Sequence, residues 1–225
     1  MKKLCCLLLL AFASLSLPAY AEPLAAVTFI PIPSLPTIIT KPGNYYFVAN
    51  MYFQVASATA PSVAITVNAP GPVTIDMRGF TLSSQTRFLF QPGYVTVDPT
   101  AISILSSDVT VRNGEISGFW NGLLAAGTGN ASVGTYLSRI HLEKVKFLAS
   151  DNEAVGLTKV NNSVVRDCDF TETYAGIQDY GSQTGNTYIN DKVGNANDLY
   201  QFHIQSFINN PIVYTINVTS ETTNP

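Results

Sequence analysis

The sequence has little cysteine, histidine and charge, and these shortages exclude several kinds of site. Its 225 residues include three cysteines and two histidines, and only 12% of them are charged. It also lacks the Gly-Xaa-Ser-Xaa-Gly motif of serine hydrolases and the glycine-rich loop that binds phosphate. We therefore expect no zinc site, no serine triad and no bound cofactor.

The first 21 residues have the order of a secretory leader. Lys2 and Lys3 are followed by an apolar run, residues 4–17, and then by the small-residue segment Ala19-Tyr20-Ala21. A membrane anchor is the alternative, but the run is shorter than the roughly 20 residues that cross a bilayer and ends at Pro18. We predict cleavage after this segment and no membrane span in the mature chain. We expect a secreted, periplasmic or cell-surface location and a bacterial source.

The charge of the mature chain argues against nucleic acid as a partner, and its cysteine count argues against an intrachain disulfide. The whole chain has a formal net charge of −3, and loss of Lys2 and Lys3 makes it about −5. An acidic chain without basic clusters is not typical of a nucleic-acid-binding protein. Cys5 and Cys6 leave with the leader, so Cys168 has no partner for an intrachain disulfide, and the core has to stabilise the fold.

Two types of apolar segment repeat along the chain from about residue 63, and no long stretch has helical periodicity. Copies of one type are "VTIDMRGFTL" from Val73, "VTVRNGEISGF" from Val109, "IHLEKVKF" from Ile140, "SVVRDCDF" from Ser163 and "TYINDKV" from Thr187. The other type precedes them, as "AITV" at Ala64, "AISI" at Ala101, "GLLA" at Gly122, "GLTK" at Gly156 and "GIQD" at Gly176. Repetition at this spacing is typical of a solenoid.

Stacking of such repeats about 4.8 Å apart predicts three internal columns of apolar side chains. The first column contains Ile75, Val111, Leu142, Val165 and Ile189. The second contains Ile65, Ile102, Leu123, Leu157 and Ile177. The third contains Leu82, Ile116, Phe147 and Phe170. An antiparallel sandwich is the alternative, but its strands need not repeat in a fixed order of types, as these do.

The segments "VTIDMRGFTL", "VTVRNGEISGF" and "NGLL" resemble the right-handed parallel β-helix repeats of the pectin-lyase-like superfamily, over roughly residues 40–195. We expect an all-β, right-handed, single-stranded parallel β-helix, a solenoid with an N-terminal cap and an irregular C-terminal coil. The expected parts are the leader at 1–21, an N-terminal segment and cap at 22–62, β-helix coils at 63–195, and a C-terminal capping segment and tail at 196–225. Members of this superfamily include lyases, hydrolases, epimerases and non-catalytic surface proteins, so the fold does not determine the function.

The resemblance implies that catalytic groups line the first strand of each coil and the loop before it. The outward positions of that strand are expected to be Thr66, Ser103, Leu124, Thr158 and Gln178. None is a carboxylate or an arginine, and only Gln178 is kept as a binding residue. The polygalacturonase signatures Asn-Thr-Asp, Asp-Asp, Gly-His-Gly and Arg-Ile-Lys are absent, as is Asp-Pro-His-Glu of alginate epimerases. We therefore expect this face to lack catalytic groups.

An outward column on the other strand type alternates in charge. Its members are Asp76, Arg112, Glu143, Arg166 and Asn190. As a catalytic site, Arg112 and Arg166 would hold an acidic sugar and Glu143 would act as general base. As a structural feature, the column is a ladder of cross-strand ion pairs, and we favour this interpretation.

Lys159 and Asp179 are expected at positions where earlier coils have Val67, Ile104 and Ala125. If both strands extend that far, the two form an adjacent ion pair, because lone buried charges are costly. If the strands end earlier, both lie in turns. We favour turns, with Asp179 kept as a candidate binding residue.

The remaining candidates lie in loops before the later coils. Three of them are the acids Asp151, Glu153 and Glu172, and Tyr174 lies nearby. A pair of these acids would suit glycoside hydrolysis, and their oxygen atoms would suit calcium, although calcium is not indicated. Solvated loop acids are the preferred interpretation. The carboxylates expected to have a structural role in turns are Asp167, Asp169 and Asp191.

Phe119 and Trp120 accompany the glycine-rich segment 126–135, "AGTGNASVGT". Together they suggest a lip on which a sugar ring stacks, because aromatic faces bind the apolar faces of sugars. A flexible excursion of the chain beside a partly buried Trp120 is the preferred interpretation.

Three functions remain open. The preferred one is a secreted or cell-envelope protein that binds a polysaccharide or another glycan without turnover. The alternative is a small polysaccharide lyase or glycoside hydrolase that acts on a cell-wall or acidic polysaccharide. The second alternative is a surface scaffold or adhesin.

Overall fold

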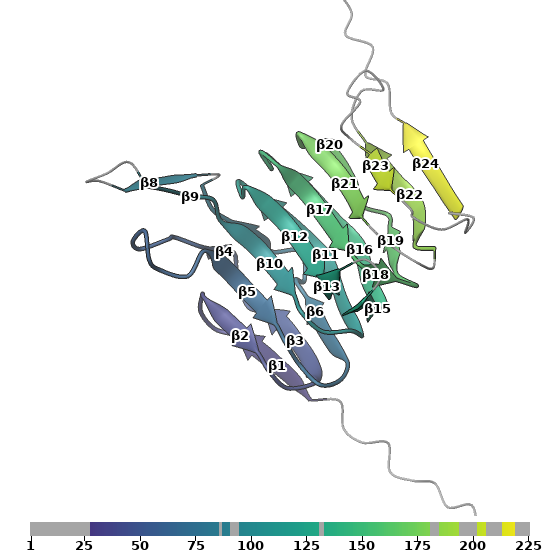
Figure 1. Ribbon diagram of the computed structural model, residues 1–225. Coiled ribbons are helices and arrows are strands. Elements are labelled where there is room, and N and C mark those ends of the chain that lie inside the picture. The colour runs from purple at the N-terminus through teal and green to yellow at the C-terminus, as the bar shows by residue number, and fades with distance from the viewer. Residues whose placement is uncertain are drawn as a thin grey trace, which may run out of the picture.

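The chain is all-β within the part that the structure describes. The computed structural model describes residues 28–85, 87–90, 95–130, 133–180, 185–193, 202–205 and 213–218, and these contain strands but no helix (Figure 1). The expectation of an all-β chain is confirmed for these ranges. The leader predicted at 1–21 lies outside the described residues.

Two long sheets contain most of the strands. Sheet A has eleven strands: β1 (Phe29–Ile32), β3 (Gly43–Phe47), β4 (Met51–Tyr52), β6 (Val73–Asp76), β7 (Thr81–Ser83), β11 (Val109–Ser117), β16 (Ile140–Leu148), β19 (Val164–Arg166), β20 (Asp169–Glu172), β22 (Thr187–Val193) and β24 (Val213–Val218). Sheet B has seven: β2 (Thr37–Ile39), β5 (Val63–Val67), β10 (Thr100–Ile104), β12 (Asn121–Ala126), β17 (Glu153–Thr158), β21 (Ala175–Tyr180) and β23 (Phe202–Gln205). The pairings described within both sheets are parallel.

The chain alternates between the two sheets along its sequence. It passes from β10 in sheet B to β11 in sheet A, returns to sheet B as β12, and continues in the same way through β16, β17, the pair β19 and β20, and β21. Each new strand pairs with the strand that the chain formed in the same sheet one passage earlier. We call one such passage through sheet B and then sheet A a coil. β23 and β24 add one further strand to each sheet at the C-terminal end. This arrangement is consistent with a parallel β-solenoid.

Three small sheets lie outside this pattern. β8 (Phe88–Phe90) and β9 (Val95–Val97) form an antiparallel pair that projects from the sheets in Figure 1. β13 (Thr128–Asn130) and β14 (Val133–Thr135) form a second antiparallel pair. β15 (Leu137–Ser138) and β18 (Val160–Asn161) pair in parallel.

Residues with positive φ lie at equivalent positions on successive coils. One group follows the paired residues Arg112, Glu143, Arg166 and Ile189, and its members are Asn113, Lys144, Asp167 and Asn190, with φ between 53° and 58°. Another group lies just before β11, β16 and β19, and its members are Asp108, Arg139 and Asn162. Left-handed backbone is uncommon for residues other than glycine, so its recurrence marks a bend that each coil makes at the same place. The Asn113-Gly114 pair is therefore a bend inside β11 and not the turn of a hairpin.

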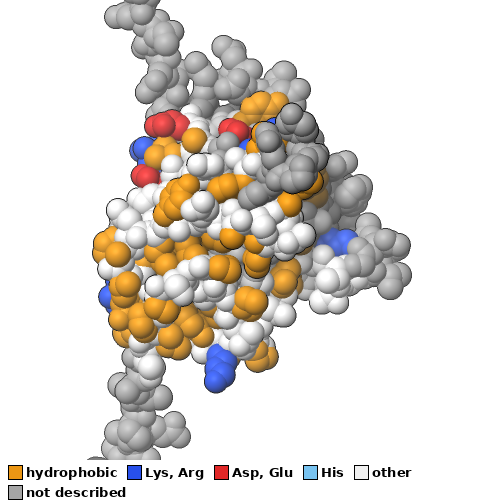
Figure 2. Space-filling model, turned by 90° about the vertical axis from the view of Figure 1, so that its left-hand side faces the viewer, with side chains coloured by type: hydrophobic (Ala, Val, Ile, Leu, Met, Phe, Trp, Pro, Cys, Tyr) orange, Lys and Arg blue, Asp and Glu red, His pale blue; other side chains and the backbone are white. Residues whose placement is uncertain are grey.

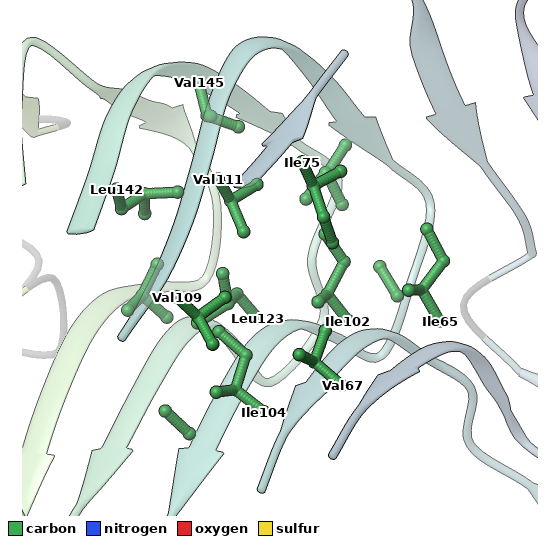
Figure 3. Packing of buried hydrophobic residues seen from close by; sticks show 14 of the residues in the cluster. Ile65, Val67, Ile75, Ile102, Ile104, Val109, Val111, Leu123, Leu142 and Val145 are labelled. Atoms are coloured by element: carbon green, nitrogen blue, oxygen red, sulfur yellow. The ribbon is translucent and has the colours of Figure 1, made fainter. Parts of the chain in front are cut away.

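The core lies between the two sheets and consists of stacked apolar side chains. In Figure 3, the side chains of β6, β11 and β16 meet those of β5, β10 and β12. The first expected column is confirmed for Ile75, Val111, Leu142 and Val165, which pair in this order. The inclusion of Ile189 is wrong, because Val165 pairs with the fully buried Tyr188. The Tyr188 hydroxyl donates a hydrogen bond to an interior carboxylate, which holds this larger side chain inward.

The second expected column contains one register error. Ile65, Ile102, Leu123 and Ile177 share it, but the structure places Val155 between Leu123 and Ile177 instead of Leu157. A shift by two residues leaves the same apolar face inward, so alternation alone cannot detect it.

The third expected column is confirmed. Ile116 pairs with Leu82 on one side and with Phe147 on the other. The rings of Phe147 and Phe170 stack with their centroids 5.2 Å apart. All four side chains are fully buried.

The core becomes polar toward the C-terminal coils. Asp191, expected in or beside a turn, is a fully buried residue of β22 that lies next to Cys168. Its Oδ1 accepts a hydrogen bond from the Cys168 N–H at 2.9 Å, and its Oδ2 has no hydrogen-bond partner among the described residues. Burial, together with the nearby charge of Asp167, raises the pKa of Asp191 to about 7. Burial also raises the pKa of the Cys168 thiol, so this cysteine is unreactive while the chain is folded.

Replacement of Asp191 by Asn is expected to change how stability depends on pH. Between its ordinary pKa of 3.8 and about 7, native Asp191 holds a proton that the unfolded chain has released. Its contribution is therefore fully present below about pH 4 and is lost as the pH rises through about 7, on the order of 4 kcal/mol in all.

The measurement is the urea midpoint of the wild type and of Asp191→Asn at pH 5 and pH 8, with the exposed acid variant Asp151→Asn as control. We expect the wild type to lose more stability than Asp191→Asn over this interval, and Asp151→Asn to follow the wild type. Equal losses in all three proteins would mean that native Asp191 is already ionised at pH 5.

Candidate functional site

The outer face of sheet A has a ladder of ion pairs. Asp76, Arg112, Glu143 and Arg166 pair in this order across four neighbouring strands, as expected. Arg112 Nη2 lies 3.0 Å from Asp76 Oδ2, and Arg166 Nη2 lies 2.9 Å from Glu143 Oε2. The placement of Asn190 in this ladder is wrong, because Arg166 pairs with Ile189.

The charges of this ladder neutralise one another. The hydrogen bond from Arg166, and then the Arg166 and Lys144 charges, lower the pKa of Glu143 against a smaller opposing effect of burial. Burial acts to raise the pKa of Asp76, but hydrogen bonds from the Arg78 N–H and from Asn113, and the charge of Arg112, outweigh it and lower the pKa. A general base at neutral pH needs a pKa near 7, so Glu143 is poorly suited to that role.

A depression of about 250 Å³ lies beside this ladder. Its lining residues are Thr110, His141, Leu142, Glu143, Val164 and Arg166. Its two charged side chains, Glu143 and Arg166, already pair with each other. The depression therefore offers a ligand no uncompensated charge.

Asp179 and Lys159 both lie in the interior, in different local structures. Lys159 is in the turn between β17 and β18, as preferred, with φ of 54° and its Nζ 3.3 Å from the Thr128 carbonyl oxygen. The preferred turn placement of Asp179 is wrong, because Asp179 is a residue of β21, 2% exposed, that pairs with Leu157 in the inward column. Its Oδ2 accepts hydrogen bonds from Asn186 Nδ2 at 2.8 Å and from the Tyr188 hydroxyl at 2.7 Å. This buried position removes Asp179 from the surface at which a glycan would bind.

The suggested lip of Trp120 and residues 126–135 does not form. Trp120 comes just before β12 and Ala126 is its last residue, so the six residues of the strand, about 20 Å, separate them. Phe119 is fully buried and stacks on Phe53, with ring centroids 6.3 Å apart. The glycine-rich segment instead forms the β13–β14 pair, beside a cavity of about 390 Å³.

Trp120 is partly buried, as expected, and it is one of three residues that each lie just before a strand of sheet B. Asn121, Glu153 and Ala175 pair across β12, β17 and β21, and the residues immediately before them are Trp120, Asn152 and Tyr174. We call Trp120, Asn152 and Tyr174 the aromatic strip. Its two aromatic residues precede strands that are two positions apart in sheet B, a separation on the order of 10 Å.

Hydrogen bonds and a cation fix the aromatic strip. The Asn152 N–H donates to the Trp120 carbonyl oxygen at 3.0 Å, and Asn152 Nδ2 donates to Asn121 Oδ1 at 2.8 Å. The Arg87 guanidinium lies over the Trp120 ring, 4.5 Å from its centroid, and Arg87 also pairs with Asp98. Tyr174 is 62% exposed. The strip therefore consists of the Trp120 ring with the Arg87 guanidinium over it, the Asn152 amide and the exposed Tyr174 ring.

The outer face of sheet B contains a carboxylate that is expected, from the sequence, to lie in a solvated loop. Glu153 is the first residue of β17, and its side chain lies over Gly156 of the same strand, where a Cβ atom would be only 2.7 Å from the carboxyl carbon. Gly156 pairs with Leu124 and with Gln178, so it takes the outward position expected for Thr158. The placement of Thr158 between Leu124 and Gln178 is therefore wrong, and a carboxylate lies on this face although none occupies the expected outward positions.

Glu153 has two polar neighbours along the strand after it. Gln178 pairs with Gly156, and the Tyr180 hydroxyl donates a hydrogen bond to Gln178 Oε1. Burial raises the pKa of Glu153, and burial together with the Glu153 charge raises the pKa of Tyr180. We call Glu153, Gly156, Gln178 and Tyr180 the Glu153 site. The signal for it in the sequence is the glycine three residues after the acid.

The other loop candidates remain on the surface. Asp151 is exposed, and its N–H donates to the Phe119 carbonyl oxygen at 3.4 Å. Glu172 is also exposed and lies 3.6 Å from Lys146 Nζ. Among the described residues, no group of three His, Cys, Asp or Glu side chains is placed to hold a metal ion.

Figure 2 shows the side of the molecule that lies on the left in Figure 1. Apolar and uncharged polar side chains cover most of it, and the few charged side chains lie near its margins. This low charge contrasts with the ladder on the outer face of sheet A.

The comparisons with known proteins give no relative. No family model, no curated protein and no solved structure matches the chain. In the described ranges, no helix is long and apolar enough to cross a membrane.

Substitutions of two adjacent residues of β16 compare the contributions of the core and of the ion-pair ladder to the free energy of unfolding. Leu142 points into the core and Glu143 points outward, so Leu142→Ala is expected to lower the free energy of unfolding by about 2 to 5 kcal/mol. Glu143→Gln is expected to lower it by less than about 1 kcal/mol, with a smaller effect at high salt. Urea denaturation at two salt concentrations measures both, and a larger loss from Glu143→Gln than from Leu142→Ala would contradict this account of the two faces.

Proposed function

We propose that the protein is a secreted or cell-envelope protein of the right-handed parallel β-helix type that binds a carbohydrate on the outer face of sheet B without turnover. The aromatic strip is the observation that carries this proposal. Two aromatic residues at the starts of β12 and β21, with the amide of Asn152 between them, combine apolar ring faces with a hydrogen-bonding group.

Several features support a binding role over the alternatives. The N-terminal sequence has the order of a secretory leader, which fits a protein that meets polysaccharides outside the cytoplasm. Repeated strands present groups at a constant spacing, which suits a polymer with a repeating unit. The resemblance of the repeats to the pectin-lyase-like superfamily agrees with a carbohydrate ligand.

A glycoside hydrolase or polysaccharide lyase is the second candidate function, and Glu153 favours it. A carboxylic acid whose pKa is raised by burial is the usual general acid of such enzymes. A hydrolase needs a second carboxylate opposite the first. The acid nearest in sequence, Asp151, is exposed to solvent, so it does not share the partly buried surroundings of Glu153. Incubation with acidic and neutral polysaccharides, followed by assays for reducing ends and unsaturated uronates, decides between the two functions, and product formation that Glu153→Gln abolishes would establish an enzyme.

The aromatic strip can be tested through its own fluorescence. Trp120 is the only tryptophan of the chain, so a glycan that stacks there should change the emission of the wild-type protein directly. Removal of a central aromatic contact usually costs more than 1 kcal/mol, and we expect Tyr174→Ala and Trp120→Ala each to weaken binding about ten-fold.

Affinity electrophoresis in gels that contain soluble polysaccharides measures the variants, since Trp120→Ala has no tryptophan fluorescence. Tyr52→Ala is the matched control, because Tyr52 is similarly exposed, at 55%, but belongs to β4 of sheet A. Equal retention of all variants, with no change in Trp120 emission for any glycan, would rule out the strip as a binding site.

A further inference from the structure

Glu153 differs from the other outward carboxylates of the described chain. Six of those acids lie within 4 Å of a basic group: Asp76, Asp98, Asp108, Glu143, Asp169 and Glu172. Among the described residues, Glu153 has neither an ion pair nor a hydrogen bond to its carboxylate. It is also partly buried, whereas Asp151 and Asp167 are exposed. Glu115 is partly buried and has no ion pair either, but its carboxylate accepts a hydrogen bond from the Thr81 hydroxyl.

The position of Glu153 results from a missing side chain. The outward row of sheet B has Thr66, Ser103, Leu124, Gly156 and Gln178 at successive positions. Gly156 leaves a gap between Leu124 and Gln178, and the Glu153 carboxylate fills it. Three polar groups, the Glu153 carboxylate, the Gln178 amide and the Tyr180 hydroxyl, therefore lie on one outer face, and Glu153 directly follows Asn152 of the aromatic strip.

A partly buried carboxylate without a cation is unfavourable, because it loses hydration without gaining a partner. A ligand that brings a cation would recover this energy on binding, and a neutral ligand would recover only part of it. The described charged groups nearest to Glu153 in sequence do not provide that cation, since Asp151 is an acid and Lys159 lies in the interior with its Nζ near the Thr128 carbonyl oxygen.

We infer that the glycan bound by the aromatic strip carries free primary amino groups, and that one of its ammonium groups pairs with the Glu153 carboxylate. This inference rests on the proposed function and specifies its ligand class. Trp120 and Tyr174 hold the apolar faces of the sugar rings. Gln178, fixed by the Tyr180 hydroxyl, supplies a neutral polar contact beside the ion pair.

The experiment compares two probes of equal length, a fully N-acetylated oligomer and a fully de-N-acetylated oligomer of β-1,4-linked glucosamine. Titration at pH 6 is followed by Trp120 fluorescence. We expect the wild type to bind the de-N-acetylated oligomer at least ten-fold more tightly. We expect Glu153→Gln to remove this preference, because it removes the charge and keeps the shape.

Two further variants separate position from charge. In Gly156→Ala, the new methyl group displaces the carboxylate, which is the mobile end of a flexible side chain, and the preference should fall although the charge is kept. Asp151→Asn removes an exposed negative charge two residues away and should retain the preference. Thermal unfolding of each variant confirms that it is folded.

The outcomes distinguish this inference from the proposed function. Equal affinity of the wild type for both oligomers, or an unchanged preference in Glu153→Gln, overturns the inference, while a Trp120 response to the neutral oligomer still supports glycan binding. A preference lost equally in Asp151→Asn also overturns it, because general attraction between opposite charges then explains the result. Binding of neither oligomer, nor of any other glycan, overturns both.

Discussion

The fold depends on apolar side chains that stack between two parallel sheets. Strands of three to six residues, such as β6, β12 and β21, cannot be stable alone, because their partners come from coils far away in the sequence. Each buried aliphatic side chain contributes about 1.5 to 3 kcal/mol when it leaves water. Columns such as Ile75, Val111 and Leu142 add these contributions from coil to coil, without a disulfide among the described residues. Bends with positive φ at equivalent positions keep the coils in register.

The same stacking determines which groups reach each outer face. On sheet A, successive coils place acids beside bases, so the charges on the outer face form ion pairs with one another. On sheet B, the outward row has uncharged side chains and one glycine, and an unpaired Glu153 occupies the gap. The two faces therefore differ in charge for a reason that comes from packing: the acids and bases on sheet A pair with each other, and the Glu153 carboxylate on sheet B has no ion pair among the described residues.

Much of the fold could be predicted from the sequence, because alternation with a period of two and repeated segments both report on buried faces. Register was harder. Val155 and Leu157 are both apolar and both inward, so pattern alone cannot choose between them, and the choice of Leu157 put Thr158 where Gly156 lies. That error hid the Glu153 site. The sequence predicts a turn for Asp179 because charges are usually exposed, and for Asp191 because Asx residues commonly stabilise turns, whereas the C-terminal coils bury both side chains in the core.

The register of β12 against β17 supports both the core and the proposed site, and a disulfide can measure it. In mature protein with Cys168→Ser, the exposed pair Ala126 and Thr158 is replaced by cysteines, since their Cα atoms lie about 4.8 Å apart across parallel strands, within disulfide range. The register expected from the sequence would instead pair Leu124 with Thr158. Our account predicts that Ala126→Cys/Thr158→Cys oxidises completely to an intrachain disulfide, while Leu124→Cys/Thr158→Cys remains reduced. The opposite result, or no cross-link in either protein, would contradict the stacking on which the core and the Glu153 site depend.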